Sequence, residues 1–425
     1  MARSATSRHP RLLSDPDVFR YVAARIVSLA GSAVTFIALP VLIYGITGSP
    51  TWTSLVIVAE AVPYLLLGLL AGVMADHVDR RRMMVTTDLL AAATLATIPV
   101  AAWLDVLTAP HVLVAALVGR TIFVFFDAAN QGALPSLVPR DRLPSANALV
   151  FGGSTVAETV VPVIAGALIV VVSPASVIAI DVLTFVASAM LVRSIARPLS
   201  ASRPAGSAIG WSAVGDGARF IVRHEVVRIM IVIGALVAFS AGSLMAVLVV
   251  WADRVLDVRE GDWRLGVLYG AWGVGAVVGS VVVPMLVRRF GGVRAALLIL
   301  PVAAVSGLAL SLPSTWLPAA VLVALWSVMY IMIATISVTL RQQVTPEPLM
   351  SRVMTAGRMA TFGVGYPVGA LLAGVLATRM DADDAILACQ ASLLLAAVIA
   401  WLSPLRSAPR TLAPAADADA PNTTN

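Results

Sequence analysis

Ionisable side chains interrupt several of the long apolar stretches of this sequence. If these stretches cross a membrane, each charge near the bilayer centre costs roughly 2.5–3.5 kcal/mol, so such side chains must pair or line a water-filled cavity. A carboxylate in an apolar cavity can hold a proton that it would lose in water, and can thereby couple a process to a proton gradient. Asp181, like Asp88, lies near the end of its stretch, where local pairing or helix capping is expected. The residues inside the stretches are Arg25, Glu60, Arg120, Asp127, Glu158 and Asp181.

Helical spacing places further polar side chains on the same faces as these charges. Residues three, four or seven positions apart share one face of a helix. We expect each resulting stripe to face a cavity and not lipid. The stripes are Arg25 with Ser28, Ser32 and Thr35; Glu60 with Thr53 and Tyr64; Arg120 with Asp127 and Gln131; and Glu158 with Asn147, Phe151 and Ser154.

The second half of the chain has no acid deep within an apolar stretch, so a proton carrier belongs in the first half. We expect Asp127 or Glu158 to be that carrier, with Glu60 as the third candidate. Arg120 and Arg25 are the expected charge partners. The alternative is that Arg120–Asp127 or Arg25–Glu158 is a permanent structural ion pair.

A substrate cavity also needs hydroxyls and aromatic rings. Aromatic side chains can bind a bulky apolar or amphiphilic molecule, although a single ring in an apolar helix can equally face lipid or the core. No GxxxxGK[ST] phosphate loop and no HExxH motif occurs, and one cysteine builds no metal cluster. We therefore expect no cofactor and no metal, with a proton gradient as the energy source. The substrate-cavity candidates are Ser32, Thr35, Phe36, Tyr64, Gln131, Ser154, Trp326 and Tyr330.

The composition indicates that a membrane surrounds the elements that carry these residues. Of the 425 residues, 59% are hydrophobic and 12% are charged, whereas soluble proteins have about 45–50% and about 25%. This excludes an ordinary cytosolic enzyme, a disordered chain and a nucleic-acid binder, despite the net charge of +6. The expected partners are the lipid bilayer and a small-molecule substrate, with no nucleic acid, and the chain is expected to be a monomer.

Twelve apolar segments are long enough to span a bilayer, which takes about 20 residues. We predict an all-α integral membrane protein with twelve transmembrane helices in two pseudo-symmetric six-helix bundles. The predicted helices cover 18–46, 51–75, 83–105, 111–136, 146–172, 174–197, 225–251, 263–288, 293–312, 316–340, 352–378 and 383–405.

Arginine, which supplies all 29 basic residues, concentrates in alternate connections between these segments. Connections rich in arginine stay on the cytoplasmic side, so both termini are predicted to be cytoplasmic, in the inner (plasma) membrane of a bacterium. The predicted units are a cytoplasmic N-terminal segment 1–17, a six-helix bundle 18–197, a cytoplasmic linker 198–224, a six-helix bundle 225–405 and a disordered cytoplasmic tail 406–425.

An internal repeat supports the two bundles. Short motifs recur at an offset of 205–207 residues, which is difficult to obtain from chance matches. Parallel repeats of six helices are typical of transporters whose substrate lies between the halves. The matched motifs begin at Gly72 and Gly279, at Val138 and Val344, and at Pro162 and Pro367.

The segment GVMADHVDRRRMM at 72–84 resembles the signature of the major facilitator superfamily, G-x-x-x-D-R-x-G-R-R. The chain departs from it at His77 and Asp79, and it has V-P-x-x-A-G at 161–166 where antiporters have G-P-x-x-G-G. Most of the chain resembles the drug/proton antiporter branch, which includes macrolide-efflux and enterobactin-export proteins. The residues that carry this resemblance are Ser28, Gly31, ALP at 38–40, TGS at 47–49, Asp88, LPSLVPRDRLPSANAL at 134–149 and IDVLTFVASA at 180–189.

The resemblance implies a secondary active exporter of hydrophobic or amphiphilic small molecules, of drug or antibiotic type, that works by alternating access and proton antiport. The alternatives are export of a dedicated metabolite, such as a siderophore or a self-made antibiotic, and proton-coupled uptake. No nucleophile–base pair is visible, so an enzyme is not expected. The resemblance also implies a conformational latch, formed by Gly72, Asp76, Arg80, Arg81 and Arg82. In this latch Gly72 would allow close helix approach, and Asp76 would pair with an arginine or cap a helix. The alternative is an ordinary positive-inside loop.

Overall fold

The structure is a computed structural model of the 425-residue chain. It describes residues 12–139, 171–200, 219–259, 262–346 and 349–407, and the positions 142, 146, 149, 150, 153, 157, 160, 161, 164, 165 and 168. Within these residues, 11 helices are long and apolar enough to cross a membrane. The described positions between 146 and 171 are also helical, in the stretch where the sequence predicts another span. The protein therefore has an all-α membrane fold.

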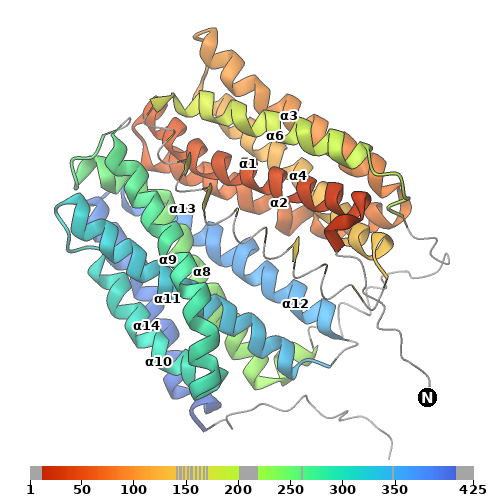
Figure 1. The fold of residues 1–425 in the computed structure, drawn as a ribbon. Helices are drawn as coiled ribbons and strands as arrows, with labels where there is room; N and C mark the ends of the chain where they lie inside the picture. The colour runs from red at the N-terminus through yellow and green to blue at the C-terminus, as the bar shows by residue number, and fades with distance from the viewer. Residues whose placement is uncertain are drawn as a thin grey trace, which may run out of the picture.

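The described helices of the first half pack against one another as one bundle, in red to yellow in Figure 1. Helix α1 lies along α6, α2 lies along α4, and α3 contacts both α4 and α6. The polar stripes on these helices therefore meet inside the bundle. The helices are α1 (Pro16–Thr47), α2 (Pro50–His77), α3 (Arg80–Trp103), α4 (Ala109–Leu137) and α6 (Pro174–Arg193).

The helices of the second half form another bundle, in green to blue in Figure 1, in which α8 contacts α11, α13 and α14. The sequence predicts one helix over 352–378. The structure has three parts there, because a π-helical segment, Met359–Gly365, separates two α-helices. The helices are α8 (Glu225–Arg254), α9 (Trp263–Phe290), α10 (Gly292–Ala309), α11 (Trp316–Val344), α12 (Met350–Arg358), α13 (Tyr366–Leu376) and α14 (Ala382–Leu402).

Local residues set the helix ends. The Asp15 carboxylate accepts from the first backbone N–H groups of α1, and Asp79 does the same for α3, which satisfies donors that have no partner within the helix. Gly48 ends α1 with a φ of 59°, and Gly291, with a φ of 82°, separates α9 from α10. Both positions use a left-handed backbone that glycine adopts without strain.

Close helix contacts in the second bundle depend on small residues. A Cβ atom at Gly242 or Gly369 would overlap a backbone carbonyl of the partner helix, that of Tyr366 or Phe239, respectively. A Cβ at Gly275 would overlap the carbonyl of Ala324 in the same way. Glycine is the residue that lets helix backbones approach this closely in a membrane, so α8 is firmly joined to α13, and α9 to α11.

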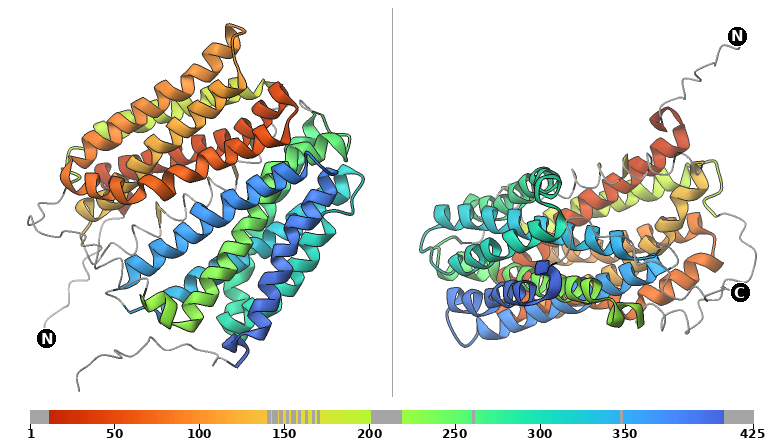
Figure 2. Two further views of the ribbon diagram at one scale, coloured as in Figure 1. Left: turned by 180° about the vertical axis from the view of Figure 1, so that it is seen from behind. Right: turned by 90° about the horizontal axis from the view of Figure 1, so that it is seen from below.

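The two bundles lie side by side (Figure 2), with α2 against α8, α13 and the π-helical segment. Two side-chain hydrogen bonds join α1 to α8 at the end opposite the arginine-rich connections. Tyr44 Oη donates to Asp253 Oδ2 at 2.8 Å, and Arg254 Nη2 donates to the Gly48 carbonyl at 3.3 Å. These contacts close the interface between the bundles at that end.

Candidate functional site

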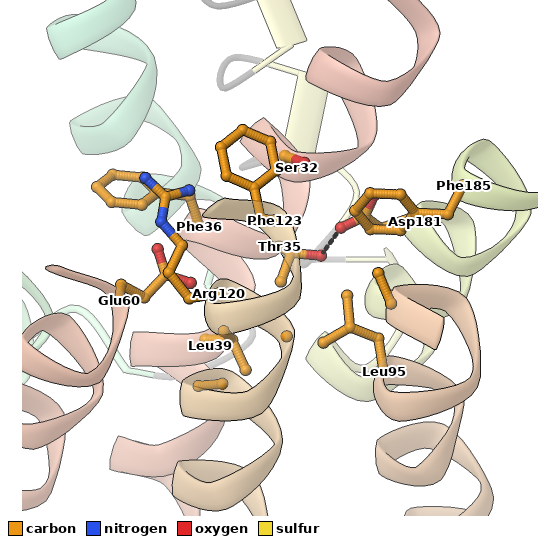
Figure 3. A pocket seen from close by; sticks show the side chains of 13 residues that line it. Ser32, Thr35, Phe36, Leu39, Glu60, Leu95, Arg120, Phe123, Asp181 and Phe185 are labelled. Atoms are coloured by element: carbon orange, nitrogen blue, oxygen red, sulfur yellow. Dashed lines mark hydrogen bonds between the residues drawn. The ribbon is translucent and has the colours of Figure 1, made fainter. Parts of the chain in front are cut away.

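A cavity of about 70 Å³ that is lined by apolar and charged side chains lies inside the first bundle, between α1, α2, α3, α4 and α6 (Figure 3). Five predicted site residues, Ser32, Thr35, Phe36, Glu60 and Arg120, line it together with Asp181. In Figure 3, Glu60 and Arg120 lie beside each other, and Asp181 lies on another side of the cavity. The lining comprises Ser32, Thr35, Phe36, Leu39, Glu60, Ala91, Leu95, Ala116, Gly119, Arg120, Phe123, Asp181 and Phe185.

Asp181 is 1% exposed and accepts hydrogen bonds only from hydroxyl groups within the described residues. Thr35 Oγ1 on α1 donates to Oδ2 at 2.5 Å, and Thr184 Oγ1 donates to Oδ1 at 2.9 Å. The predicted local pairing is therefore found with Thr184. Helix capping is not, because Asp181 lies two turns inside α6 and its second partner is on another helix.

Asp127 is the centre of a second polar cluster and is 5% exposed. Its carboxylate accepts from Arg25 Nη2 at 3.3 Å, Tyr64 Oη at 2.6 Å and Gln131 Nε2 at 3.2 Å. Arg25 and not Arg120 is therefore its ion-pair partner. Three donors around both oxygens are the surroundings of an ionised carboxylate.

Arg120 instead lies over the ring of Phe123, with Cζ 4.6 Å from the ring centroid. Helical spacing correctly places Arg120 and Asp127 on one face of α4, but they are seven residues and about 10 Å apart along the helix axis. That separation places them at two different depths along the bundle. Arg120 faces the cavity with Glu60, and Asp127 lies nearer the arginine-rich end.

Asp88 is a buried acid that the site predictions did not include. It is 1% exposed, and Ser188 Oγ donates to its Oδ2 at 2.7 Å, while Oδ1 is buried without a partner in the described part of the chain. The signal in the sequence was its position inside an apolar stretch, six residues after the end of the arginine run Arg80–Arg82. The expected local pairing is wrong, because Ser188 belongs to α6.

Trp326 and Tyr330 lie in the second bundle, away from the cavity that holds the acids. Their rings stack at 5.4 Å, and Trp272 meets both edge-on. Trp326 Nε1 donates to Gln390 Oε1 at 3.1 Å, and Gln390 is fully buried. The sequence therefore named two members of an aromatic cluster and missed its polar centre, Gln390.

The residues of the predicted latch lie at the end of α2, which contains Gly72 and Asp76, and in the first turn of α3, which contains Arg80, Arg81 and Arg82. Arg80 Nη1 donates to the Gly132 carbonyl of α4 at 3.0 Å, and Arg81 Nη2 donates to the carbonyls of Ala196 and Arg197 beyond the end of α6, so both arginines join α3 to other parts of the first bundle. Arg82 is exposed. No described atom lies within 4 Å of a Cβ placed at Gly72, so the expected close approach is not found in the described part.

Three predicted residues lie outside what the structure describes. Glu158 and Ser154 fall between described positions of the fifth predicted span, and the side chain of Asp76 is not described. Among the described residues, no group of three His, Cys, Asp or Glu side chains could hold a metal ion. The carboxylates that border the described cavity are Glu60 and Asp181.

Comparison with known proteins identifies relatives over the whole chain. Residues 13–424 match the family model of transmembrane secretion effectors. The chain is 26% identical to the multidrug efflux pump Tap of Mycolicibacterium fortuitum over 411 residues, which covers 94% of this chain and 97% of that pump. It is 27% identical to the macrolide efflux protein A of Streptococcus pyogenes over 176 residues, 41% of this chain and 44% of that protein.

The fold is similar to that of a bacterial homologue of the human lysosomal transporter Spinster, solved in an inward-facing, unoccupied conformation. The TM-score is 0.74 at 13% sequence identity, and the alignment covers 94% of this chain and 98% of that structure. At this identity the similarity concerns the fold alone.

Proposed function

We infer the function of this chain from the family to which it belongs, the transmembrane secretion effectors, which are major facilitator transporters and not enzymes. The chain is a multi-pass membrane transporter of small molecules. We propose that it exports hydrophobic or amphiphilic molecules of drug or antibiotic type across the plasma membrane of a bacterium. Its similarity to efflux pumps along almost the whole chain supports this direction and this substrate class.

The observation that supports a proton-coupled mechanism is that, among the described residues, the buried acids all belong to the first bundle. Asp88, Asp127 and Asp181 are at most 5% exposed, and all three belong to the first bundle, where Asp181 borders the cavity with Glu60. Buried acids in a membrane mark ion or proton pathways. We propose that protons drive export and that Asp127 or Glu60 carries them.

The contacts of Asp127 suggest which step of a proton-driven transport cycle the conformation of this structure represents. Ionised Asp127, held by Arg25, Tyr64 and Gln131, corresponds to a transporter that has released its proton. The hydrogen bonds from Tyr44 and Arg254 close the end that the arginine pattern assigns to the outside. Substrate would then enter from the cytoplasm, and protonation from outside would restart the cycle by alternating access.

The first prediction tests proton coupling at these acids. Asp127→Asn cannot release a proton, so substrate efflux should fall to the level that wild-type cells show with a proton uncoupler, and added uncoupler should change it no further. Glu60→Gln should give a smaller loss. Dye or antibiotic efflux from cells with matched expression measures both.

Asp384→Asn provides the matched control, because Asp384 is an exposed acid in the first turn of α14. This variant should retain wild-type efflux and wild-type sensitivity to the uncoupler. Efflux from wild-type cells that the uncoupler does not reduce would contradict proton antiport. Accumulation of the substrate inside the cells would contradict export.

A further inference from the structure

One charged side chain of the second bundle reaches the Asp127 cluster of the first. Arg358, the last residue of α12, lies over the ring of Tyr64 on α2, with Cζ 4.8 Å from the ring centroid. Among the described residues, this is the one cation–π contact that joins the two bundles. A cation over an aromatic face is attracted by the negative charge density of the ring.

Tyr64 connects this cation to the acid. Its hydroxyl donates to Asp127 Oδ2 at 2.6 Å, and its ring presents a face to Arg358. The hydrogen bond to the carboxylate fixes the orientation of the ring and increases the electron density that Arg358 meets. Arg25 lies on the other oxygen of Asp127 at 3.3 Å. The charge of Asp127 thus stands between two cations, one from each bundle.

Neutralising Asp127 would change this balance. Arg25 and Arg358 would remain as two like charges on either side of the Asp127–Tyr64 pair, without the anion that attracts both, and like charges repel. Arg358 is an exposed side chain, so it can move away without crossing packed residues. The attraction between Arg358 on α12 and Tyr64 on α2 is therefore weaker when Asp127 is neutral.

The backbone beside Arg358 is suited to such a movement. The π-helical segment begins at the next residue, Met359, and ends at Gly365. A Cβ at Gly365 would overlap the carbonyl of Ala235, so α13 is held against α8 at the end of that segment. Short π-helical insertions within α-helices are frequent at functional sites. They also leave α12 joined to the fixed α13 through a less regular turn.

We propose that Arg358 is the positioning residue through which the second bundle responds to the charge on Asp127. This inference rests on the proposed proton coupling. With Asp127 ionised, Tyr64 holds Arg358, and α12 stays against α2; with Asp127 protonated, Arg358 leaves and α12 moves. The ionisable and polar groups that face Asp127 or its partners are Arg25 and Tyr21 from α1, Tyr64 from α2, Asp88 from α3, Arg120 and Gln131 from α4, and Arg358 from α12.

The test follows α12 directly, without relying on transport. A reporter cysteine replaces the exposed Thr355 in a Cys389→Ala background, which removes the buried native cysteine. Its labelling rate by a thiol reagent is measured against pH in the purified, full-length protein. After correction for thiol ionisation, the labelling rate of the reporter protein that retains Asp127 and Arg358 should change between two levels as the pH is varied. Asp127→Asn should abolish that transition.

Arg358→Ala should also abolish the transition and reduce export about tenfold, whereas Arg358→Lys should retain both in part. Tyr64→Phe keeps the ring under Arg358 but removes the hydroxyl that binds Asp127, so it should behave like Arg358→Ala. Combining Arg358→Ala with Asp127→Asn should add no further loss. Arg289→Ala is the matched control, because Arg289 lies over Phe290 at 5.4 Å on the exposed end of α9.

Two results would overturn the inference: a wild-type labelling rate that does not vary with pH, or an unchanged transition in both Arg358→Ala and Tyr64→Phe. Either result leaves proton coupling intact if export still depends on the uncoupler and on Asp127. Conversely, export that ignores the uncoupler would contradict the proposed proton coupling, while a pH transition that disappears in Arg358→Ala would still establish the contact as a charge-dependent switch.

Discussion

At the scale of single residues, the environment of Asp181 depends on a glycine, Gly31, which has no side chain to separate α1 from α6. Gly31 on α1 faces α6 at the point where Asp181 accepts hydrogen bonds from Thr35 and Thr184. A Cβ at Gly31 would overlap both Thr184 Oγ1 and Asp181 Oδ1. The glycine therefore lets α1 approach α6 closely enough for Thr35 to reach the carboxylate.

Gly31→Ala should consequently destabilise the first bundle by about 1–3 kcal/mol, the usual cost of forcing an extra methyl group into a packed interior. The melting temperature of the purified protein in detergent measures the loss. Gly68→Ala is the matched control, since the nearest described atom to a Cβ there is a Tyr64 ring carbon at an ordinary 3.8 Å. Equal melting temperatures for the two variants would show that α1 does not depend on Gly31 for its position.

At the scale of helices, the sequence predicted one continuous span over 352–378 and could not reveal its π-helical segment. Hydropathy reports which residues are apolar, and the apolar residues of Met359–Gly365 could equally belong to an α-helix. At the end of the segment the backbone packs against another helix, because Gly365 and Gly369 fit against the carbonyls of Ala235 and Phe239 in α8. Such backbone contacts depend on the partner helix, which periodicity within one segment does not specify.

Deleting Ala360 tests what this segment does. Removing one residue allows a regular α-helix, in which α12 keeps nearly its present orientation, because a π-helical turn holds about one residue more than an α-helical turn. The less regular turn that joins α12 to α13 would be lost and α12 would move less easily, so export should fall toward the level of Arg358→Ala, while the protein remains folded by its melting curve. Met359→Leu preserves the length of the segment and should be neutral. Wild-type export after the deletion would mean that α12 does not need the π-helical turn.

At the scale of the whole molecule, the sequence predicted the membrane fold and the location of the buried acids, because hydropathy and helical spacing are local properties. It did not predict which residues would pair. Asp127 binds Arg25 and not Arg120, and Asp88 binds Ser188 on α6. These choices depend on which helices are neighbours, and spacing within one helix carries no such information. Arg358 was missed for the same reason, since its partner lies in the other bundle.

The relative position of the bundles is held at one end by few polar contacts. Tyr44 donates to Asp253 at 2.8 Å, and Arg254 reaches the Gly48 carbonyl of α1 and the Ala377 carbonyl beyond α13. If the transporter alternates between two states, these bonds exist in the state described here and break in the other. Their strength therefore sets part of the free-energy difference between the states.

Tyr44→Phe removes one of these bonds without changing the packing of the ring. A hydrogen bond contributes about 1 kcal/mol, so the equilibrium should shift about fivefold toward the state open at this end. A cysteine at Leu42, which is 7% exposed in this state, should then react faster with a membrane-impermeant thiol reagent in a Cys389→Ala background. Asp253→Ala should give the same increase, and the double variant should exceed neither, because both substitutions break one bond. An unchanged labelling rate in Tyr44→Phe would mean that this end is closed by apolar contact alone, with the hydrogen bond contributing nothing to the choice of state.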